Sequence, residues 1–99
     1  MIIYIAGPIT GVADYKENFA EVERELTSAG HVVLNPAVLP QGMGDLRTYM
    51  HVCLPMIDVA DAVVMLPGWE NSLGANREYG YATALDKTIT EVCPGEVPR

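Results

Sequence analysis

Residues 66–80, LPGWENSLGANREYG, combine a hydroxyl group, several small residues and a carboxylate in one short stretch. Ser72 suits the N-cap of a helix, and Gly74 and Ala75 leave the amides of the first turn uncovered. Exposed amides, a hydroxyl group and the positive end of the helix dipole can together hold an anion such as phosphate. The alternative is a simple helix cap without a ligand.

Glu78 follows Ser72 inside the same expected helix. On the helix face turned toward the strand ends, its carboxylate is expected to be partly desolvated, which raises its pKa or requires a hydrogen-bonding partner. Tyr4, in the expected first strand, can supply that partner with its phenol group. The alternative is an ordinary solvated glutamate on a helix surface.

The sequence lacks the patterns of common cofactor sites. It contains neither GxxxxGK[ST] nor GxGxxG, so a P-loop and a dinucleotide fold are unsupported. Cys53 and Cys93 have no spacing typical of a metal site or a disulfide framework, which favours reduced thiols. We expect neither a metal nor an organic cofactor. Trp69 is either a loop anchor or a lid over a bound ligand.

The elements that must position these groups alternate between strands and helices. Short apolar runs predict strands at residues 2–6, 31–36, 62–67 and 88–92. Apolar residues at helical spacing predict helices between them, the second interrupted or kinked near Pro55. This alternation predicts an α/β fold with a parallel sheet covered on both faces. Ligands bind such sheets beyond the carboxyl ends of the strands, where the turns at 7–11 and 68–74 fall.

Composition limits the classes of function. The chain has 99 residues, 49% of them hydrophobic, and a net charge of −7. It is expected to form one domain over residues 1–92, followed by a loose tail at 93–99. The acidic balance disfavours nucleic acid and anionic membranes as partners. The N-terminus resembles a first strand rather than a signal peptide, so we expect a soluble cytoplasmic protein, and its small core suggests a homo-oligomer.

Taken together, IYIAGPITG, GHVVLNPA and DAVVMLPGWENSLGANREYGYA resemble the nucleoside 2-deoxyribosyltransferase-like superfamily. The resemblance extends to about Lys87 and is closest to a small, often phage-encoded branch with the pattern AGP…LPGW..S.GA..E, related to the 2′-deoxynucleoside 5′-monophosphate N-hydrolases. It implies a flavodoxin-like three-layer α/β sandwich with a four-stranded parallel sheet in the order 2-1-3-4.

The same resemblance implies roles for individual residues. The glutamate that matches Glu78 is the nucleophile, which attacks C1′ and forms a glycosyl ester that a second base or water resolves. The tyrosine that matches Tyr4 orients it. In the N-hydrolase branch, the matching serine and the first glycine loop hold the 5′-phosphate. The implied phosphate-binding residues are Gly7, Pro8, Thr10, Gly11, Ser72, Gly74 and Ala75.

The chain departs from the superfamily pattern at three places. The usual base-side aspartate falls at Cys53, and Asp58 and His51 are the nearby polar residues that can substitute for it. A phosphate-binding arginine of some hydrolases falls at Thr10. The resemblance also implies that superfamily enzymes complete each site with a C-terminal segment of a neighbouring subunit, a segment that we expect this chain to lack after Val92. Without the aspartate, protonation of the leaving group, typically worth about 10²–10⁴ in rate, is in question.

The sequence therefore predicts cleavage or transfer at the N-glycosidic bond of a (deoxy)nucleoside 5′-monophosphate or nucleoside. The main alternative is a nucleotide-binding or regulatory protein that has lost turnover. A flavin electron carrier on the same fold is disfavoured, because a Ser/Thr-rich first loop and paired aromatic residues are missing. A structural or partner-binding protein is the third alternative.

Overall fold

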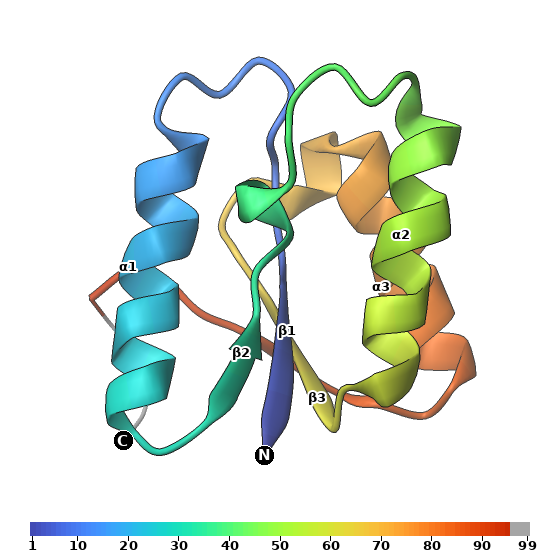
Figure 1. The fold of residues 1–99 in the computed structure, drawn as a ribbon. Helices are drawn as coiled ribbons and strands as arrows, with labels where there is room; N and C mark the ends of the chain where they lie inside the picture. The colour runs from blue at the N-terminus through green and yellow to red at the C-terminus, as the bar shows by residue number, and fades with distance from the viewer. Residues whose placement is uncertain (96–99) are drawn as a thin grey trace.

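Parallel strands form the centre of the molecule in this computed structural model, which describes residues 1–95 (Figure 1). Within that range the sheet has four strands in the order β2–β1–β3–β4, every neighbouring pair parallel. This order confirms the predicted flavodoxin-like topology. The strands are β1 (Ile2–Ala6), β2 (Val32–Leu34), β3 (Ala62–Met65) and β4 (Thr88–Glu91).

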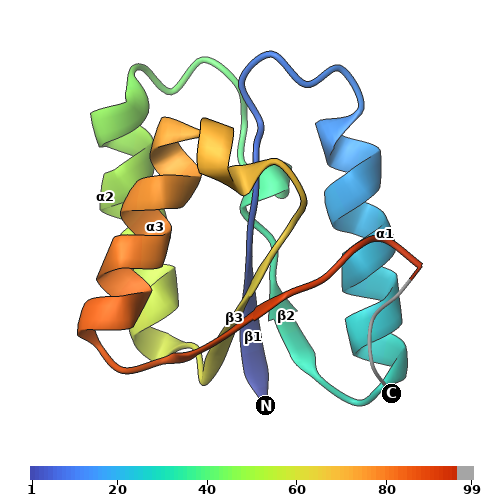
Figure 2. The ribbon, with the colours of Figure 1, turned by 180° about the vertical axis from the view of Figure 1, so that it is seen from behind.

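Helices cover both faces of the sheet and complete the three layers (Figures 1 and 2). Helix α1 covers one face, and α2 and α3 lie side by side on the other. The helices are α1 (Tyr15–Ser28), α2 (Leu46–Val59) and α3 (Leu73–Ala84), and the short 3-10 turns are η1 (Pro36–Val38) and η2 (Trp69–Asn71). No helix within residues 1–95 combines the length and apolarity needed to cross a bilayer.

The alternation of side chains along β1 assigns each residue to one face of the sheet. Ile3 and Ile5 pack in the core layer beneath α1, whereas Tyr4 and Ala6 pack in the layer beneath α2 and α3. A strand sends successive side chains to opposite faces, so this assignment follows from the position of Tyr4 in the strand. The phenol of Tyr4 is thereby placed on the same side of the sheet as α3.

The structure gives further detail on the helices and on the C-terminal segment. Helix α2 continues through Pro55 without being split. Asp14 precedes α1, but its side chain makes no capping hydrogen bond, whereas Asp45 and Ser72 accept hydrogen bonds from their first-turn amides. The predicted tail at 93–99 is described only to Gly95, whose amide donates to Glu25 Oε2 of α1 at 2.9 Å, and residues 96–99 lie outside the described range.

The turns that follow β1 and β3 are in direct contact. Leu66 N donates to Ala6 O at 2.8 Å, and a Cβ placed on Gly7 would lie 2.8 Å from Leu66 Cβ. Pro8 Cγ lies 3.5 Å from the position of a Cβ on Gly68. A side chain at Gly7 would therefore force the two strand ends apart.

Replacing Gly7 by alanine is expected to lower the free energy of unfolding by about 1–3 kcal/mol, the usual range for overpacking. Urea denaturation measures this difference. Gly80→Ala is the matched control, because Gly80 lies in α3 and a Cβ there meets no atom within 4 Å. The control is expected to stabilise the protein by up to about 1 kcal/mol through helix propensity. Wild-type stability in Gly7→Ala would contradict the close contact.

Candidate functional site

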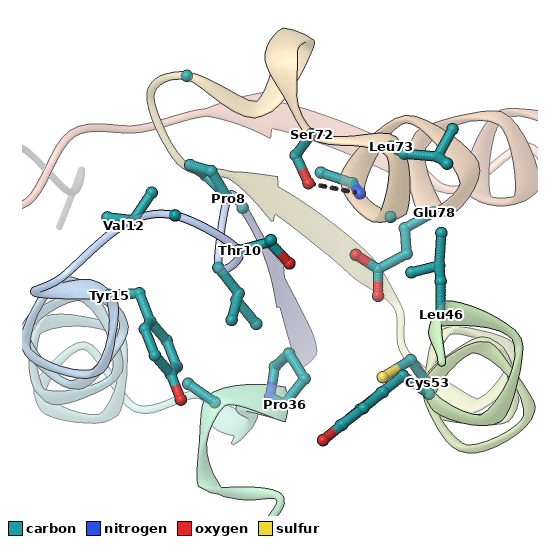
Figure 3. Close-up of a pocket in the computed structure, with 18 of the residues that line it drawn as sticks. Pro8, Thr10, Val12, Tyr15, Pro36, Leu46, Cys53, Ser72, Leu73 and Glu78 are labelled. Atoms are coloured by element: carbon teal, nitrogen blue, oxygen red, sulfur yellow. Dashed lines mark hydrogen bonds between the residues drawn. The ribbon is translucent and has the colours of Figure 1, made fainter. Parts of the chain in front are cut away.

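A pocket of about 1270 Å³ opens at the carboxyl ends of β1 and β3 (Figure 3). Its walls come from the turn after β1, the start of α1, the segment from η1 to α2, and the turn that leads into α3. This edge of the sheet is where neighbouring strands lead to helices on opposite faces, α1 after β1 and α3 after β3. Open α/β sheets bind their ligands at such a switch point.

A buried pair of side chains, Tyr4 and Glu78, lies at the floor of this pocket. The Tyr4 hydroxyl donates a hydrogen bond to Glu78 Oε2, as predicted from the sequence. Tyr4 is fully buried and Glu78 is 5% exposed. Burial raises the pKa of Glu78 from its usual 4.5 to about 7, and the hydrogen bond from Tyr4 opposes the rise. Burial and the nearby carboxylate raise the pKa of Tyr4, so its phenol remains a donor.

Cys53 of α2 approaches the same pair. Its side chain is buried in the packed layer between the sheet and the helices, yet the sulfur atom faces the pocket (Figure 3). Burial raises the pKa of the thiol, interaction with the Tyr4 hydroxyl lowers it, and the charge on Glu78 raises it further. The net pKa is raised, so Cys53 presents a neutral thiol where the resemblance implies an aspartate.

The start of α3 forms another wall of the pocket. Ser72 is its N-cap residue, and Ser72 Oγ accepts from Ala75 N at 3.2 Å. The hydroxyl hydrogen remains available to a ligand, because a hydroxyl both accepts and donates. A Cβ on Gly74 would lie 3.1 Å from Leu46 Cδ1, so Gly74 also allows α3 to approach α2. The side chain of Thr10 reaches into the pocket from the facing turn (Figure 3).

The structure brings most of the predicted site residues together. Those that line this one pocket are Gly7, Pro8, Thr10, Gly11, Cys53, Ser72, Gly74, Ala75 and Glu78. Tyr4 joins them through its hydrogen bond to Glu78.

Asp58, His51 and Trp69 lie elsewhere. Asp58 and His51 line a separate shallow groove between α2 and α3, and Asp58 Oδ1 accepts from Tyr81 Oη at 2.6 Å. The Trp69 ring stacks on Tyr79 with ring centroids 4.7 Å apart, and Trp69 Nε1 donates to Glu91 Oε1 at 2.6 Å. None of these three residues lines the main pocket, which disfavours the predicted base-side roles and favours the loop-anchor interpretation of Trp69.

Two tyrosines in the lining were not predicted as site residues. Tyr49 Oη donates to Pro40 O at 2.9 Å and accepts from Met43 N at 3.3 Å. Tyr15 Oη accepts from Gln41 Nε2 at 2.8 Å. Both hydroxyls thus hold the loop before α2 against the pocket. In the sequence, the helical spacing of Tyr49 indicates only which face of the helix it occupies. No sequence pattern predicts that the loop before α2 folds back onto its hydroxyl.

The side-chain amide of Asn76 organises the turn that presents Ser72. Asn76 Nδ2 lies 3.3 Å from Trp69 O, 2.9 Å from Glu70 O and 2.8 Å from Ser72 O. Three carbonyl groups that precede the helix therefore point at one donor group. This arrangement fixes the backbone on which Ser72 Oγ and the first-turn amides are carried.

Charged and metal-binding groups are sparse at this site. Among the described residues, no group of three or more histidine, cysteine, aspartate or glutamate side chains is arranged to hold a metal ion. Every buried side-chain nitrogen or oxygen in the described range has a hydrogen-bonding partner.

Comparisons with known proteins agree on the fold. A family model described as a domain of unknown function, DUF4406, matches residues 1–91. A 2-deoxyribosyltransferase from Bacillus psychrosaccharolyticus superposes with a TM-score of 0.73 and 22% identity, over 100% of this chain and 77% of that one. A 2-desoxiribosyltransferase from Leishmania mexicana gives 0.69 and 27% identity, over 91% of this chain and 62% of that one. No curated protein sequence matches significantly.

Proposed function

We propose that this chain, which belongs to the DUF4406 family, cleaves or transfers the N-glycosidic bond of a (deoxy)nucleoside or its 5′-monophosphate. The observation that supports this most strongly is the buried Tyr4–Glu78 pair at the floor of a large pocket, on a fold shared with 2-deoxyribosyltransferases. A carboxylate that is shielded from water and aimed into a cavity suits nucleophilic attack on a sugar.

Glu78 is the nucleophile in this mechanism. Its free carboxylate oxygen attacks C1′ while the bond to the base breaks, which gives a glycosyl ester. Tyr4 donates to the other oxygen and fixes the direction of attack. Water or a second base then attacks C1′ and releases the carboxylate. Water gives hydrolysis, and a second base gives transfer.

The start of α3 and the turn after β1 hold the 5′ end of the substrate. In Figure 3 the Glu78 carboxylate lies between Ser72 and Cys53. A phosphate bound by Ser72 Oγ and the first-turn amides, at the positive end of the helix dipole, leaves C1′ within reach of Glu78. The base then extends toward Cys53. Only uncharged hydrogen-bond donors bind the phosphate in this mechanism, because Thr10 occupies the position at which the family resemblance implies an arginine in some hydrolases.

A panel of deoxynucleosides, ribonucleosides and their 5′-monophosphates tests the proposal. Free base is separated by chromatography after incubation with the intact protein and with Glu78→Ala. We expect base release from at least one substrate with the intact protein alone. No release above the buffer blank from any substrate would refute catalysis.

Cys53 is the observation that favours a second candidate function, a nucleotide-binding protein without turnover. The Cys53 thiol, whose pKa is raised by burial, is a much weaker proton donor to a departing base than a carboxylic acid. Thermal stabilisation by a nucleotide that stays intact after prolonged incubation would identify this alternative. Cleavage of the same nucleotide would exclude it.

The rate of base release is expected to rise with pH and level off above about pH 7. The nucleophile must be ionised, and burial raises the pKa of Glu78 to about 7. Measuring kcat/KM between pH 5 and 9 gives the apparent pKa of the free enzyme. A profile that is already flat at pH 5 would contradict a buried glutamate as the ionising group.

Replacing Asn76 by alanine is expected to raise KM for 5′-monophosphates more than KM for nucleosides, and to lower the free energy of unfolding by about 1–2 kcal/mol. The amide no longer holds the three carbonyls before α3, so Ser72 loses its fixed orientation. Steady-state kinetics on matched nucleosides and nucleotides measures the effect. Asn76→Asp, of equal size but without the donor, is expected to behave similarly, and wild-type kinetics in both variants would refute the positioning role.

A further inference from the structure

Both charged side chains that line the pocket are acids. Of the described lining residues, Asp45 and Glu78 carry carboxylates, and none is lysine, arginine or histidine. The whole chain has a net charge of −7. Such a cavity favours a ligand with a positive charge over a neutral ligand of the same shape, since the fields of the carboxylates add within it.

Two anchored tyrosine rings line the same cavity. The hydroxyls of Tyr15 and Tyr49 are engaged with the loop before α2, through Gln41 in one case and Pro40 and Met43 in the other. Their rings supply aromatic surface to the pocket lining. Aromatic faces attract cations by about 0.5–2 kcal/mol. The rings therefore add to the preference that the carboxylates create.

At the end of the pocket that receives the base in the proposed mechanism, the group beside Glu78 is the weakly acidic thiol of Cys53. Cys53 lies on the side of Glu78 away from Ser72 (Figure 3), and burial keeps its thiol neutral. A neutral base needs a proton as it departs, and acid assistance is typically worth about 10²–10⁴ in rate. A base that is already cationic departs as a neutral molecule and needs no proton.

We propose that the pocket selects N-glycosides whose base carries a positive charge, as N-alkylated purines and pyridinium bases do. The inference rests on the proposed function. Glu78 forms a bond to C1′ while the C1′–N bond breaks, and the electron pair of that bond returns to the ring and cancels its charge. Water then attacks C1′, one of its protons passes to solvent, and the Glu78 carboxylate leaves.

A matched pair of substrates tests this selection: deoxyguanosine 5′-monophosphate and its N7-methyl derivative, which share sugar and phosphate. For each, kcat/KM is divided by the uncatalysed cleavage rate in the same buffer. The resulting enhancement is expected to be at least about 100-fold larger for the methylated nucleotide. Equal enhancements, both dependent on Glu78, would overturn the selection and leave the proposed function intact.

Asp45→Asn provides a second test that preserves the fold. Asparagine caps helices as well as aspartate does, so α2 keeps its N-cap. Isothermal titration with each nucleotide, under conditions without turnover, measures Kd. The variant is expected to weaken binding of the methylated nucleotide several-fold more than binding of the unmodified one. If neither nucleotide is cleaved, the proposed function fails. Independently of cleavage, equal affinity of the wild-type protein for both nucleotides would overturn the selection.

Discussion

Replacing Glu78 by glutamine is expected to lower kcat/KM for base release by about 10³-fold or more. Glutamine keeps the size of the side chain and can still accept the hydrogen bond from Tyr4, but its amide oxygen is a poor nucleophile. Without the ester intermediate, the remaining rate comes only from substrate binding and orientation. Base release under saturating and limiting substrate separates kcat from KM, and we expect the loss in kcat.

Two comparisons make this result specific. Tyr4→Phe removes the hydrogen bond to Glu78 and leaves the carboxylate, so a smaller loss, about 10–100-fold, is expected. Glu17→Gln removes an exposed acid from α1, outside the pocket lining, and is expected to retain wild-type kinetics. A Glu78→Gln variant within tenfold of the wild-type rate would rule out Glu78 as the nucleophile.

The same Glu78→Gln substitution is expected to stabilise the protein at alkaline pH. The pKa of Glu78 is about 7 in the folded protein against the usual 4.5. Between these values the folded state holds a proton that the unfolded chain has released, so the free energy of unfolding falls as pH rises through this window. The full loss is about 3 kcal/mol once the carboxylate is ionised in both states. Glutamine carries no charge and avoids the loss.

Urea denaturation at pH 4 and at pH 8 measures this effect. Glu78→Gln is expected to exceed the wild type by up to about 3 kcal/mol at pH 8 and to match it near pH 4. Glu17→Gln is expected to follow the wild type at both values, because its parent side chain is exposed. Lower stability of Glu78→Gln at pH 8 would show that ionised Glu78 is better stabilised than its burial implies.

Loss of activity together with a gain in stability is typical of a functional site. A buried carboxylate of raised pKa destabilises the fold above pH 7, and no structural need for it is evident in the described residues. Tyr4 contributes one hydrogen bond, which lowers the pKa of Glu78 less than burial raises it. This combination is what the proposed catalytic role of the pair predicts.

The sequence predicted the parts of the site that depend on local rules. Alternation along β1 places Tyr4 beneath α3, and the N-cap preference of serine places Ser72 at the start of that helix. Tyr4 and Glu78 meet because the Tyr4 side chain lies in the layer between the sheet and α3, where the Glu78 side chain is also buried. The strand order came with the family resemblance, since periodicity alone does not order strands.

Other parts depend on long-range packing and could not be read from the sequence. Helical spacing indicates only which face of α2 Tyr49 occupies, but the pocket wall arises because its hydroxyl binds the loop at Pro40. Asp58 and Trp69 are near the site in sequence, yet their side chains form hydrogen bonds with Tyr81 and Glu91, and neither residue lines the pocket. Membership of a phage-encoded branch and assembly into a homo-oligomer stay predictions.

The most direct measurement of the central claim is trapping of the ester on Glu78. A deoxynucleoside 5′-monophosphate with fluorine at C2′ slows departure from the ester, because fluorine destabilises the positive charge that develops at C1′. Intact-protein mass spectrometry, followed by peptide mapping, locates the adduct. We predict one fluorinated sugar phosphate on Glu78 and none on Glu78→Gln. Base release from this substrate without an adduct, or with the adduct on another residue, would contradict the mechanism.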